Sequence, residues 1–268
     1  MKRCLILLLT ALMLFSMAHA EEVSDMYIDA SLGKLYGVLN LPEGEGPFPL
    51  IILSHGFGGS HAGSLGYAAR FAENGFATFC LDFCGGGLGS KSDGTMREMT
   101  VLTEAEDLTA VIRHFETDAR FSGISLWGQS QGGFVSSYVA AQMPDTIRCL
   151  VIEFPAYVLQ DDAKARAQAD GSFTETSNVM GMTIGRRYNE DAVSFDIYEV
   201  IGAYAGPALI LHGDRDAIVP LRYSERAAET FPDAELVVMP GQNHGFFGAA
   251  LKEAMERETD FFLEHAAD

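Results

Sequence analysis

The chain has 268 residues, 48% of them hydrophobic, and a formal net charge of −19 at neutral pH. That length and apolar content suffice for one α/β domain with a substantial core. The acidic excess disfavours nucleic acid and anionic membranes as partners, because both are themselves negatively charged.

Residues 1–20 have the pattern of a secretory signal peptide. Lys2 and Arg3 precede the apolar run 4–17, and Ala18-His19-Ala20 supplies the small residues of a cleavage site. An uncleaved membrane anchor is the alternative interpretation, although the apolar run is short for a bilayer span. We expect cleavage, export to the periplasm or the medium, and a mature domain over 21–268 that does not bind membranes.

Short apolar runs alternate with helix-compatible segments along the mature chain. The expected strands are 26–30, 35–41, 50–53, 76–83, 124–127, 148–154, 207–211 and 234–239. The expected helices are 65–74, 100–115, 134–142, 221–230 and 249–265. The first two strands form an antiparallel hairpin, and the later alternation implies a mostly parallel arrangement. The fold class is therefore α/β, with a central sheet of about eight strands flanked by helices.

A glycine-rich loop, His55-Gly56-Phe57-Gly58-Gly59, directly follows the strand 50–53. Glycines after a strand let backbone N–H groups approach a ligand closely. Catalytic sites that stabilise an oxyanion can take one N–H donor from such a loop and a second from the residue after the nucleophile, and the nucleophile in this chain would be Ser130. We assign these two donors to Phe57 and Gln131, and we expect His55 to brace the loop without titrating in the reaction.

The segment Gly128-Gln129-Ser130-Gln131-Gly132 is a GxSxG sequence between a strand and a helix. Side chains two positions either way from the serine would collide in so tight a turn, which explains the two glycines. The turn lifts the Ser130 hydroxyl clear of the sheet, beside helical N–H groups that lack intrahelical partners. Alone, the motif also fits an ordinary βα loop, so its interpretation depends on the rest of the chain.

The alternation stops over 155–205, about fifty residues rich in charged and small side chains. Loops of this length are uncommon unless they are functional. We therefore predict an inserted cap over the active site, between strands six and seven, with short helices of its own. A disordered surface insertion is the alternative.

An acid and a histidine each lie on a loop after a late strand. The strand 207–211 leads into a loop with Asp214 and Asp216, and the strand 234–239 leads into a loop with His244. A nucleophilic serine needs a neighbouring base, and that base needs an anion to orient it. We therefore predict a triad in the order Ser130, aspartate, His244, at the edge of the sheet where open α/β folds bind ligands.

Three cysteines follow the leader, Cys80, Cys84 and Cys149, and this odd number does not suggest a disulfide framework. We expect three buried thiols. The chain has neither a CxxC nor an HExxH sequence, so we propose no metal site. The triad chemistry needs no cofactor.

Four motifs together resemble those of the α/β-hydrolase family: HGFGG at 55–59, GQSQGG at 128–133, HGDRDAIVP at 212–220 and NHGF at 243–246. The resemblance covers the chain from Val23 onward. It places the triad acid at the second aspartate of its motif, Asp216, and leaves Asp214 to tie the loop together. Gln129 departs from the histidine that usually precedes the nucleophile in this family, at a position whose side chain points away from the reacting atom.

Three features more narrowly resemble the cinnamoyl and feruloyl esterases: the HGF loop at 55–57, the SQGG turn at 130–133 and the cap at 155–205. That group cleaves hydroxycinnamate esters, including those attached to plant polysaccharide. Its cap carries polar residues for the phenolic hydroxyl, which implies this role for Tyr188 and for Asp161 or Asp162. The expected substrate is therefore a small-molecule or polysaccharide-linked ester.

Other functions stay open. A general short-chain carboxylesterase could have nearly the same sequence, and a serine aminopeptidase-like hydrolase would need a site for a free amine, which we do not identify. The retained triad and oxyanion residues disfavour a non-catalytic binding protein. A dienelactone-type hydrolase is disfavoured because its nucleophile is cysteine, whereas this chain has Ser130. The sequence leaves the oligomeric state open.

Overall fold

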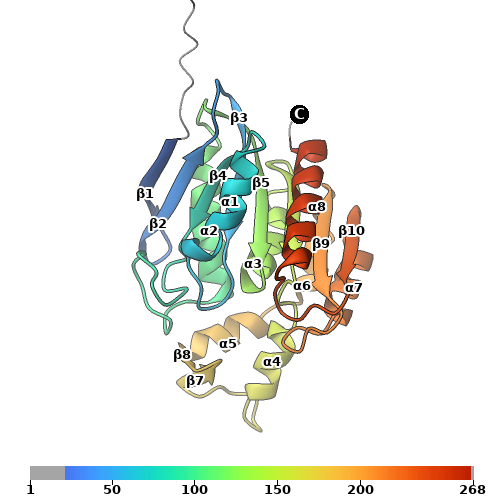
Figure 1. Ribbon diagram of the computed structural model, residues 1–268. Coiled ribbons are helices and arrows are strands. Elements are labelled where there is room, and N and C mark those ends of the chain that lie inside the picture. The colour runs from blue at the N-terminus through green and yellow to red at the C-terminus, as the bar shows by residue number, and fades with distance from the viewer. Residues whose placement is uncertain (1–21, 267–268) are drawn as a thin grey trace, which may run out of the picture.

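The computed structural model describes residues 22–266 and contains an eight-stranded central sheet (Figure 1). The strands of this sheet are β1 (Glu22–Ala30), β2 (Gly33–Leu41), β3 (Phe48–Ser54), β4 (Ala77–Leu81), β5 (Phe121–Gln129), β6 (Ile147–Glu153), β9 (Ala208–Gly213) and β10 (Ala234–Met239). The helices outside the 155–205 segment are η1 (His61–Gly63), α1 (Leu65–Ala72), α2 (Val101–Phe115), α3 (Gln131–Gln142), α7 (Arg222–Thr230) and α8 (Ala249–His265). The expected signal peptide, 1–20, lies outside the described residues.

The strand order is β1-β2-β4-β3-β5-β6-β9-β10. The pairs β1–β2 and β2–β4 are antiparallel, whereas the pairs from β4 to β10 are parallel. The predicted fold class, a mostly parallel sheet of about eight strands flanked by helices, is therefore confirmed. Parallel strands end at one common edge, so the loops that follow β3, β5, β9 and β10 meet there.

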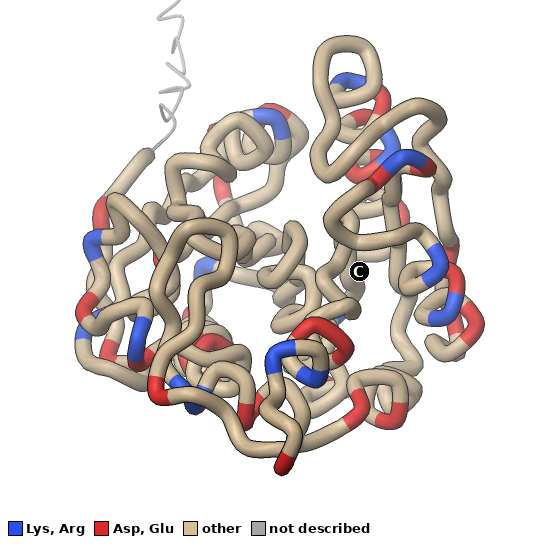
Figure 2. Tube along the Cα trace, turned by 90° about the horizontal axis from the view of Figure 1, so that it is seen from below, with Lys and Arg blue, Asp and Glu red and all other residues tan. Residues whose placement is uncertain are grey.

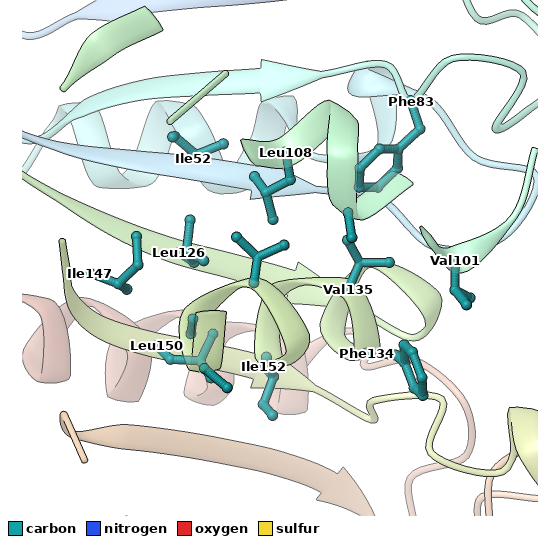
Figure 3. Packing of buried hydrophobic residues seen from close by; sticks show 14 of the residues in the cluster. Ile52, Phe83, Val101, Leu108, Leu126, Phe134, Val135, Ile147, Leu150 and Ile152 are labelled. Carbon is teal, nitrogen blue, oxygen red and sulfur yellow. The ribbon is translucent and has the colours of Figure 1, made fainter. Parts of the chain in front are cut away.

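Each face of the sheet has its own hydrophobic core, because successive residues of a strand point to opposite faces. On β5, Leu126 belongs to the core beneath α2 and α3, and Trp127 belongs to the core beneath α1 and α8. Figure 3 shows the first core, with Leu108 of α2 and Val135 of α3 beside Leu126. Both β5 side chains are fully buried, which fixes the register of the strand that leads to Ser130.

The segment between β6 and β9 forms a compact group at one end of the sheet (Figure 1). Its elements are α4 (Leu159–Arg166), the hairpin of β7 (Thr176–Val179) and β8 (Met182–Gly185), α5 (Arg186–Val193) and α6 (Ile197–Ile201). Short helices were expected here and the hairpin was not, because both strands are brief and β7 is polar and partly exposed. Seen from this end, acidic and basic residues lie mainly on the outer turns of the chain (Figure 2).

Helix α3 begins at Gln131, directly after Ser130, whereas the sequence suggested a start at 134. Glycine has a low helix propensity, so the two glycines at 132 and 133 lead a sequence-based prediction to place the start of the helix after them. The three cysteines 80, 84 and 149 are buried free thiols, as expected. Within residues 22–266, none of the helices combines the length and apolar character that a bilayer crossing requires.

Candidate active site

Ser130 stands on a sharp turn between β5 and α3, with φ 50° and ψ −117°. Such a positive φ is strained for a residue with a side chain, and the surrounding packing imposes it. A Cβ on Gly128 would lie 2.5 Å from the Gly132 carbonyl oxygen, and a Cβ on Gly132 would lie 2.3 Å from the Ser54 carbonyl oxygen. Glycine is thus required at both positions for α3 to start this close to β5 and to the end of β3.

The structure brings Ser130, His244 and Asp216 together from three separate loops. The Ser130 hydroxyl lies 2.9 Å from His244 Nε2, and His244 Nδ1 lies 2.7 Å from Asp216 Oδ2. With the ring proton on Nδ1, His244 donates to the carboxylate and accepts from the serine hydroxyl. The imidazole is therefore oriented as a base toward Ser130.

Asp216 is held as an anion by several donors. Its Oδ1 accepts hydrogen bonds from the Ile218 and Val219 N–H groups at 2.8 and 2.9 Å. Burial acts to raise the pKa of this carboxyl, but the hydrogen bonds from His212, His244 and the backbone outweigh it and hold the pKa well below its usual range. Asp216 therefore carries a full negative charge beside His244 at neutral pH.

His212 is a buried neighbour of the triad that the sequence did not single out. Its Nδ1 lies 2.7 Å from Ser224 Oγ, and its Nε2 lies 2.8 Å from the Val219 carbonyl oxygen and 3.3 Å from Asp216 Oδ2. The ring thus connects β9, the Asp216 loop and α7. Its place in the HGD sequence, directly at the end of a buried strand, is the signal that could have identified it.

Two polar side chains join the Asp216 loop to the His244 loop. Asp214 Oδ1 accepts from the Gly241 N–H at 2.6 Å, which agrees with its expected role in tying the loop together. Asn243 Oδ1 accepts from the N–H groups of Ala217 and His244, at 3.0 and 2.9 Å. The relative position of acid and base is therefore fixed by hydrogen bonds between the two loops in addition to the one between the Asp216 and His244 side chains.

The HGF loop after β3 passes directly over Ser130. A Cβ on Gly56 would lie 3.2 Å from Ser130 Cβ. His55 braces this loop, since its Nε2 accepts from the Phe83 N–H at 3.1 Å and its Nδ1 lies 2.8 Å from the Gly56 carbonyl oxygen. Among residues 22–266, the Phe57 N–H has no backbone acceptor. The Gln131 N–H opens α3 and has no intrahelical acceptor, so both assigned donors are free to bind an anion.

The three cap residues expected to contact substrate lie in two different settings. Tyr188 of α5 is 1% exposed, and its hydroxyl donates to Gln131 Oε1 at 2.6 Å. Asp161 and Asp162 are exposed on α4, where Asp161 accepts from the Tyr223 hydroxyl at 2.7 Å. The structure thus brings Tyr188 to the Ser130 turn and leaves the two aspartates on the surface.

A buried polar network lies behind the Ser130 turn, on the side of α8. Gln129 donates to Glu153 Oε2 at 2.6 Å, and the Tyr67 hydroxyl lies 3.1 Å from both Glu153 oxygens. Trp127 Nε1 donates to Glu258 Oε1 of α8 at 3.2 Å. Both glutamates are fully buried. The signals in the sequence were a carboxylate at the end of an apolar strand and another within an amphipathic helix.

The carboxyl groups of Glu153 and Glu258 are close enough for each to shift the pKa of the other. Burial raises the pKa of Glu153 to about 7, although hydrogen bonds from Gln129, Glu258 and Tyr67 oppose the shift. Burial, and then the charge of Glu153, raise the pKa of Glu258 well above its usual range. With both groups ionised, Glu258 Oε2 would have no partner. A proton held between the two carboxyl groups would give Glu258 Oε2 a hydrogen-bond partner. We therefore infer that the pair retains one proton at neutral pH.

Within the described part of the chain, no cluster of three or more histidine, cysteine, aspartate or glutamate side chains is arranged to hold a metal ion. The fold and the Ser130 site define an α/β hydrolase of the serine type. The sequence model of the prolyl oligopeptidase family matches residues 65–268, and the chain belongs to that family.

Individual relatives are more distant. An uncharacterized 31.7 kDa protein from the traX-finO intergenic region of Escherichia coli is 37% identical over 114 residues, which cover 41% of this chain and 38% of that protein. Pimeloyl-[acyl-carrier protein] methyl ester esterase from Chromobacterium violaceum is 26% identical over 82% of this chain and 93% of its own length. Est1E from Butyrivibrio proteoclasticus, solved with ferulic acid bound, superposes with a TM-score of 0.80 at 27% identity, covering 89% of this chain and 98% of Est1E.

Substitution of Gly132 by alanine tests the steric origin of the turn. A Cβ there would lie 2.3 and 2.5 Å from the Ser54 and His55 carbonyl oxygens, so the strand end must move. We expect a loss of about 1–3 kcal/mol in the free energy of unfolding, measured by urea titration. Gly66→Ala in α1 is the control, because a Cβ there meets nothing within 4 Å. A Gly132→Ala protein as stable as wild type would contradict this account.

The buried carboxyl pair predicts a pH dependence of stability. An unfolded glutamate loses its proton near pH 4.5, whereas the folded pair keeps a proton to about pH 7 or above. The folded state therefore binds more protons in this window, and stability falls as pH rises, by at most about 1.4 kcal/mol per pH unit for each proton. Glu258→Gln removes one of these groups. The free energy of unfolding of this variant should therefore fall less steeply between about pH 5 and pH 8, the range over which the folded pair holds the additional proton.

The measurement is urea unfolding of wild type and Glu258→Gln at a series of pH values. Glu256→Gln serves as the control, since it removes a half-exposed carboxyl from the same helix. Parallel pH profiles for wild type and Glu258→Gln would show that the pair does not retain a proton.

Proposed function

We propose that this protein is an exported serine esterase that cleaves carboxylic esters through an acyl-enzyme. One observation carries the proposal: the Ser130 hydroxyl, the His244 ring and the Asp216 carboxylate form a continuous hydrogen-bonded chain, with distances of 2.9 and 2.7 Å. A serine activated in this way attacks carbonyl carbon. The similarity to a methyl ester esterase over 82% of the chain supports esters as the substrate class.

In the first half of the reaction, Ser130 Oγ bonds to the carbonyl carbon while its proton moves to His244 Nε2. The negative charge that develops on the carbonyl oxygen is bound by the N–H groups of Phe57 and Gln131. The tetrahedral intermediate then collapses and breaks the bond to the alcohol, which leaves with the proton from His244. Asp216 stabilises the imidazolium that exists between these steps.

In the second half, water attacks the acyl-enzyme and gives its proton to His244. The same two N–H groups bind the second tetrahedral oxyanion, and its collapse returns the proton to Ser130 Oγ and frees the carboxylic acid. Every proton in the cycle passes between His244 and an oxygen atom. No step requires a group beyond the chain, the ester and water.

The acyl group that we propose is a hydroxycinnamate, free or linked to polysaccharide. The structural similarity to Est1E with ferulic acid bound supports this choice. The cap lies over the carboxyl edge of the sheet, where it can contact an aromatic acyl chain, and Tyr188 brings an aromatic ring beside Phe57 at 5.9 Å between centroids. Asp161 and Asp162 remain proposed contacts for a phenolic hydroxyl at the outer end of such a substrate.

Hydrolysis of short peptides is a second candidate, and membership of the prolyl oligopeptidase family favours it. The same triad can cleave an amide, since His244 can protonate a leaving amine as well as an alcohol. The site would then need an acceptor for the free amino group of the substrate. An aminoacyl p-nitroanilide turned over faster than any ester would establish this function in place of esterase activity.

Ser130→Ala removes the proposed nucleophile and leaves the surrounding backbone unchanged. We expect hydrolysis of p-nitrophenyl butyrate to fall by a factor of about 10³ or more, with circular dichroism and the melting temperature close to those of wild type. Ser136→Ala, which changes a buried serine six residues further along the chain in α3, is the matched control for loss of a hydroxyl. Undiminished turnover by Ser130→Ala would exclude the triad.

The acyl preference is measured as kcat/KM on methyl ferulate and on p-nitrophenyl butyrate with the same preparation. We expect ferulate to be preferred by at least about tenfold, which is the discrimination that one well-buried group can supply. Methyl cinnamate, which lacks the phenolic hydroxyl, separates recognition of the ring from recognition of the hydroxyl. A preference for butyrate would leave a short-chain carboxylesterase.

A further inference from the structure

Tyr188 touches both residues that supply the proposed oxyanion donors. Its hydroxyl donates to the side-chain Oε1 of Gln131 at 2.6 Å. Its ring meets the Phe57 ring edge to face, with centroids 5.9 Å apart and planes at 64°. Tyr188 belongs to the cap, whereas Phe57 belongs to the loop after β3 and Gln131 is the first residue of α3. One buried cap side chain therefore bridges the two halves of the oxyanion hole.

Gln131 is held from its other side by a buried carboxyl of α2. Its Nε2 donates to Glu104 Oε2 at 2.8 Å, and Glu104 is 1% exposed. Burial raises the pKa of Glu104 well above its usual range. The hydrogen bond from Gln131 lowers this pKa, and the charge of Asp107 raises it further. A neutral carboxyl at this place needs no counter-ion and still accepts from the amide. Both ends of the Gln131 amide are thus engaged.

The position of Tyr188 is itself fixed within the cap. Its neighbour Asn189 is fully buried and accepts from Arg166 Nε of α4 at 2.8 Å. Gly185, at the start of α5, packs so closely on the loop before α2 that a Cβ would lie 2.1 Å from the Arg97 carbonyl oxygen. The cap is therefore packed against the main domain, and Tyr188 contacts the residue that follows Ser130.

We propose that Tyr188 and Glu104 are positioning residues for the oxyanion hole, which clamp the Gln131 side chain so that its backbone N–H points at the developing oxyanion. The physical basis is preorganisation: a donor stabilises the transition state only if it is already aimed at the charge and does not reorient during the reaction. Gln131 is the first residue of α3, where helix ends fray most easily. A side chain anchored at both ends opposes that fraying.

This inference rests on the proposed serine esterase function, and it makes a different prediction for Tyr188 from a role in binding the substrate phenol. Loss of a positioning residue lowers kcat on every ester and leaves KM nearly unchanged, because the oxyanion exists only in the transition state. Loss of a phenol contact lowers kcat/KM on hydroxycinnamates alone.

The test compares Tyr188→Phe with wild type on methyl ferulate and on p-nitrophenyl butyrate. We expect kcat to fall about tenfold on both esters, less than the 10²–10³ lost when a donor is removed outright, with KM within about twofold. The Ki of a trifluoromethyl ketone, which forms a tetrahedral oxyanion on Ser130, should rise by the same factor as kcat falls. A merely structural role would not link these two numbers.

Two further variants separate positioning from loss of packing. Glu104→Leu should reproduce the loss of kcat, whereas Glu104→Gln should restore most of it, because a side-chain amide oxygen can still accept from Gln131. Tyr204→Phe is the control for the loss of a buried tyrosine hydroxyl. Tyr204 is fully buried and donates to the Ile147 carbonyl oxygen at 3.4 Å, at the opposite end of β6 from Glu153. This variant should keep wild-type kcat.

Each result has a definite meaning. Equal loss on both esters, with the matching rise in Ki, supports the clamp. A loss confined to methyl ferulate, a change in KM alone, or an unchanged Ki overturns it. If Ser130→Ala still hydrolyses both esters, the proposed function itself fails; if Ser130→Ala is inactive while folded Tyr188→Phe matches wild type, only the clamp fails.

Discussion

The turn at Ser130 is the constraint on which the other parts of the site depend. Ser130 is the single residue between β5 and α3. Glycines at 128 and 132 let the backbone of α3 lie so close to β5 and to the end of β3 that a Cβ at either position would clash. The Ser130 N–H donates to the Glu153 carbonyl oxygen at 3.0 Å, and the Ser130 carbonyl accepts from Ala156 at 2.9 Å, so the end of β6 holds the strained backbone on both sides. The position of the Ser130 hydroxyl is thus fixed by β5, α3 and β6, and the HGF loop and the His244 loop pack against it.

The two glutamines that flank Ser130 have parallel surroundings. Gln129 donates to Glu153 on the α8 side, and Gln131 donates to Glu104 on the α2 side. Burial favours the neutral form of both carboxyls, so each amide meets an acceptor without a full charge being placed beside the nucleophile. A histidine at position 129 could carry a charge of its own and pair with Glu153 as an ion. In this chain Gln129 is neutral and binds Glu153 through a hydrogen bond.

Much of the fold could be predicted from the sequence, since buried parallel strands appear as short apolar runs and the helices between them have a clear period. The loop placement of Ser130, Asp216 and His244 followed from strand ends. The β7–β8 hairpin could not be predicted because each strand has only four residues and β7 is polar and partly exposed. Glu104 was missed although it lies on the apolar face of α2, where a charged residue is itself a signal. The contact between Tyr188 and Gln131 depends on how the cap packs against the main domain. The local sequence around either residue does not determine that packing.

Helix α8 couples one hydrophobic core of the sheet to the polar network behind the Ser130 turn. Glu258 of this helix accepts from Trp127 of β5, and its carboxyl lies beside that of Glu153 of β6. Ala254 and Phe262 of the same helix are buried in the core on this face of the sheet. A substitution that loosens that core would therefore also move Glu258 away from Trp127 and Glu153.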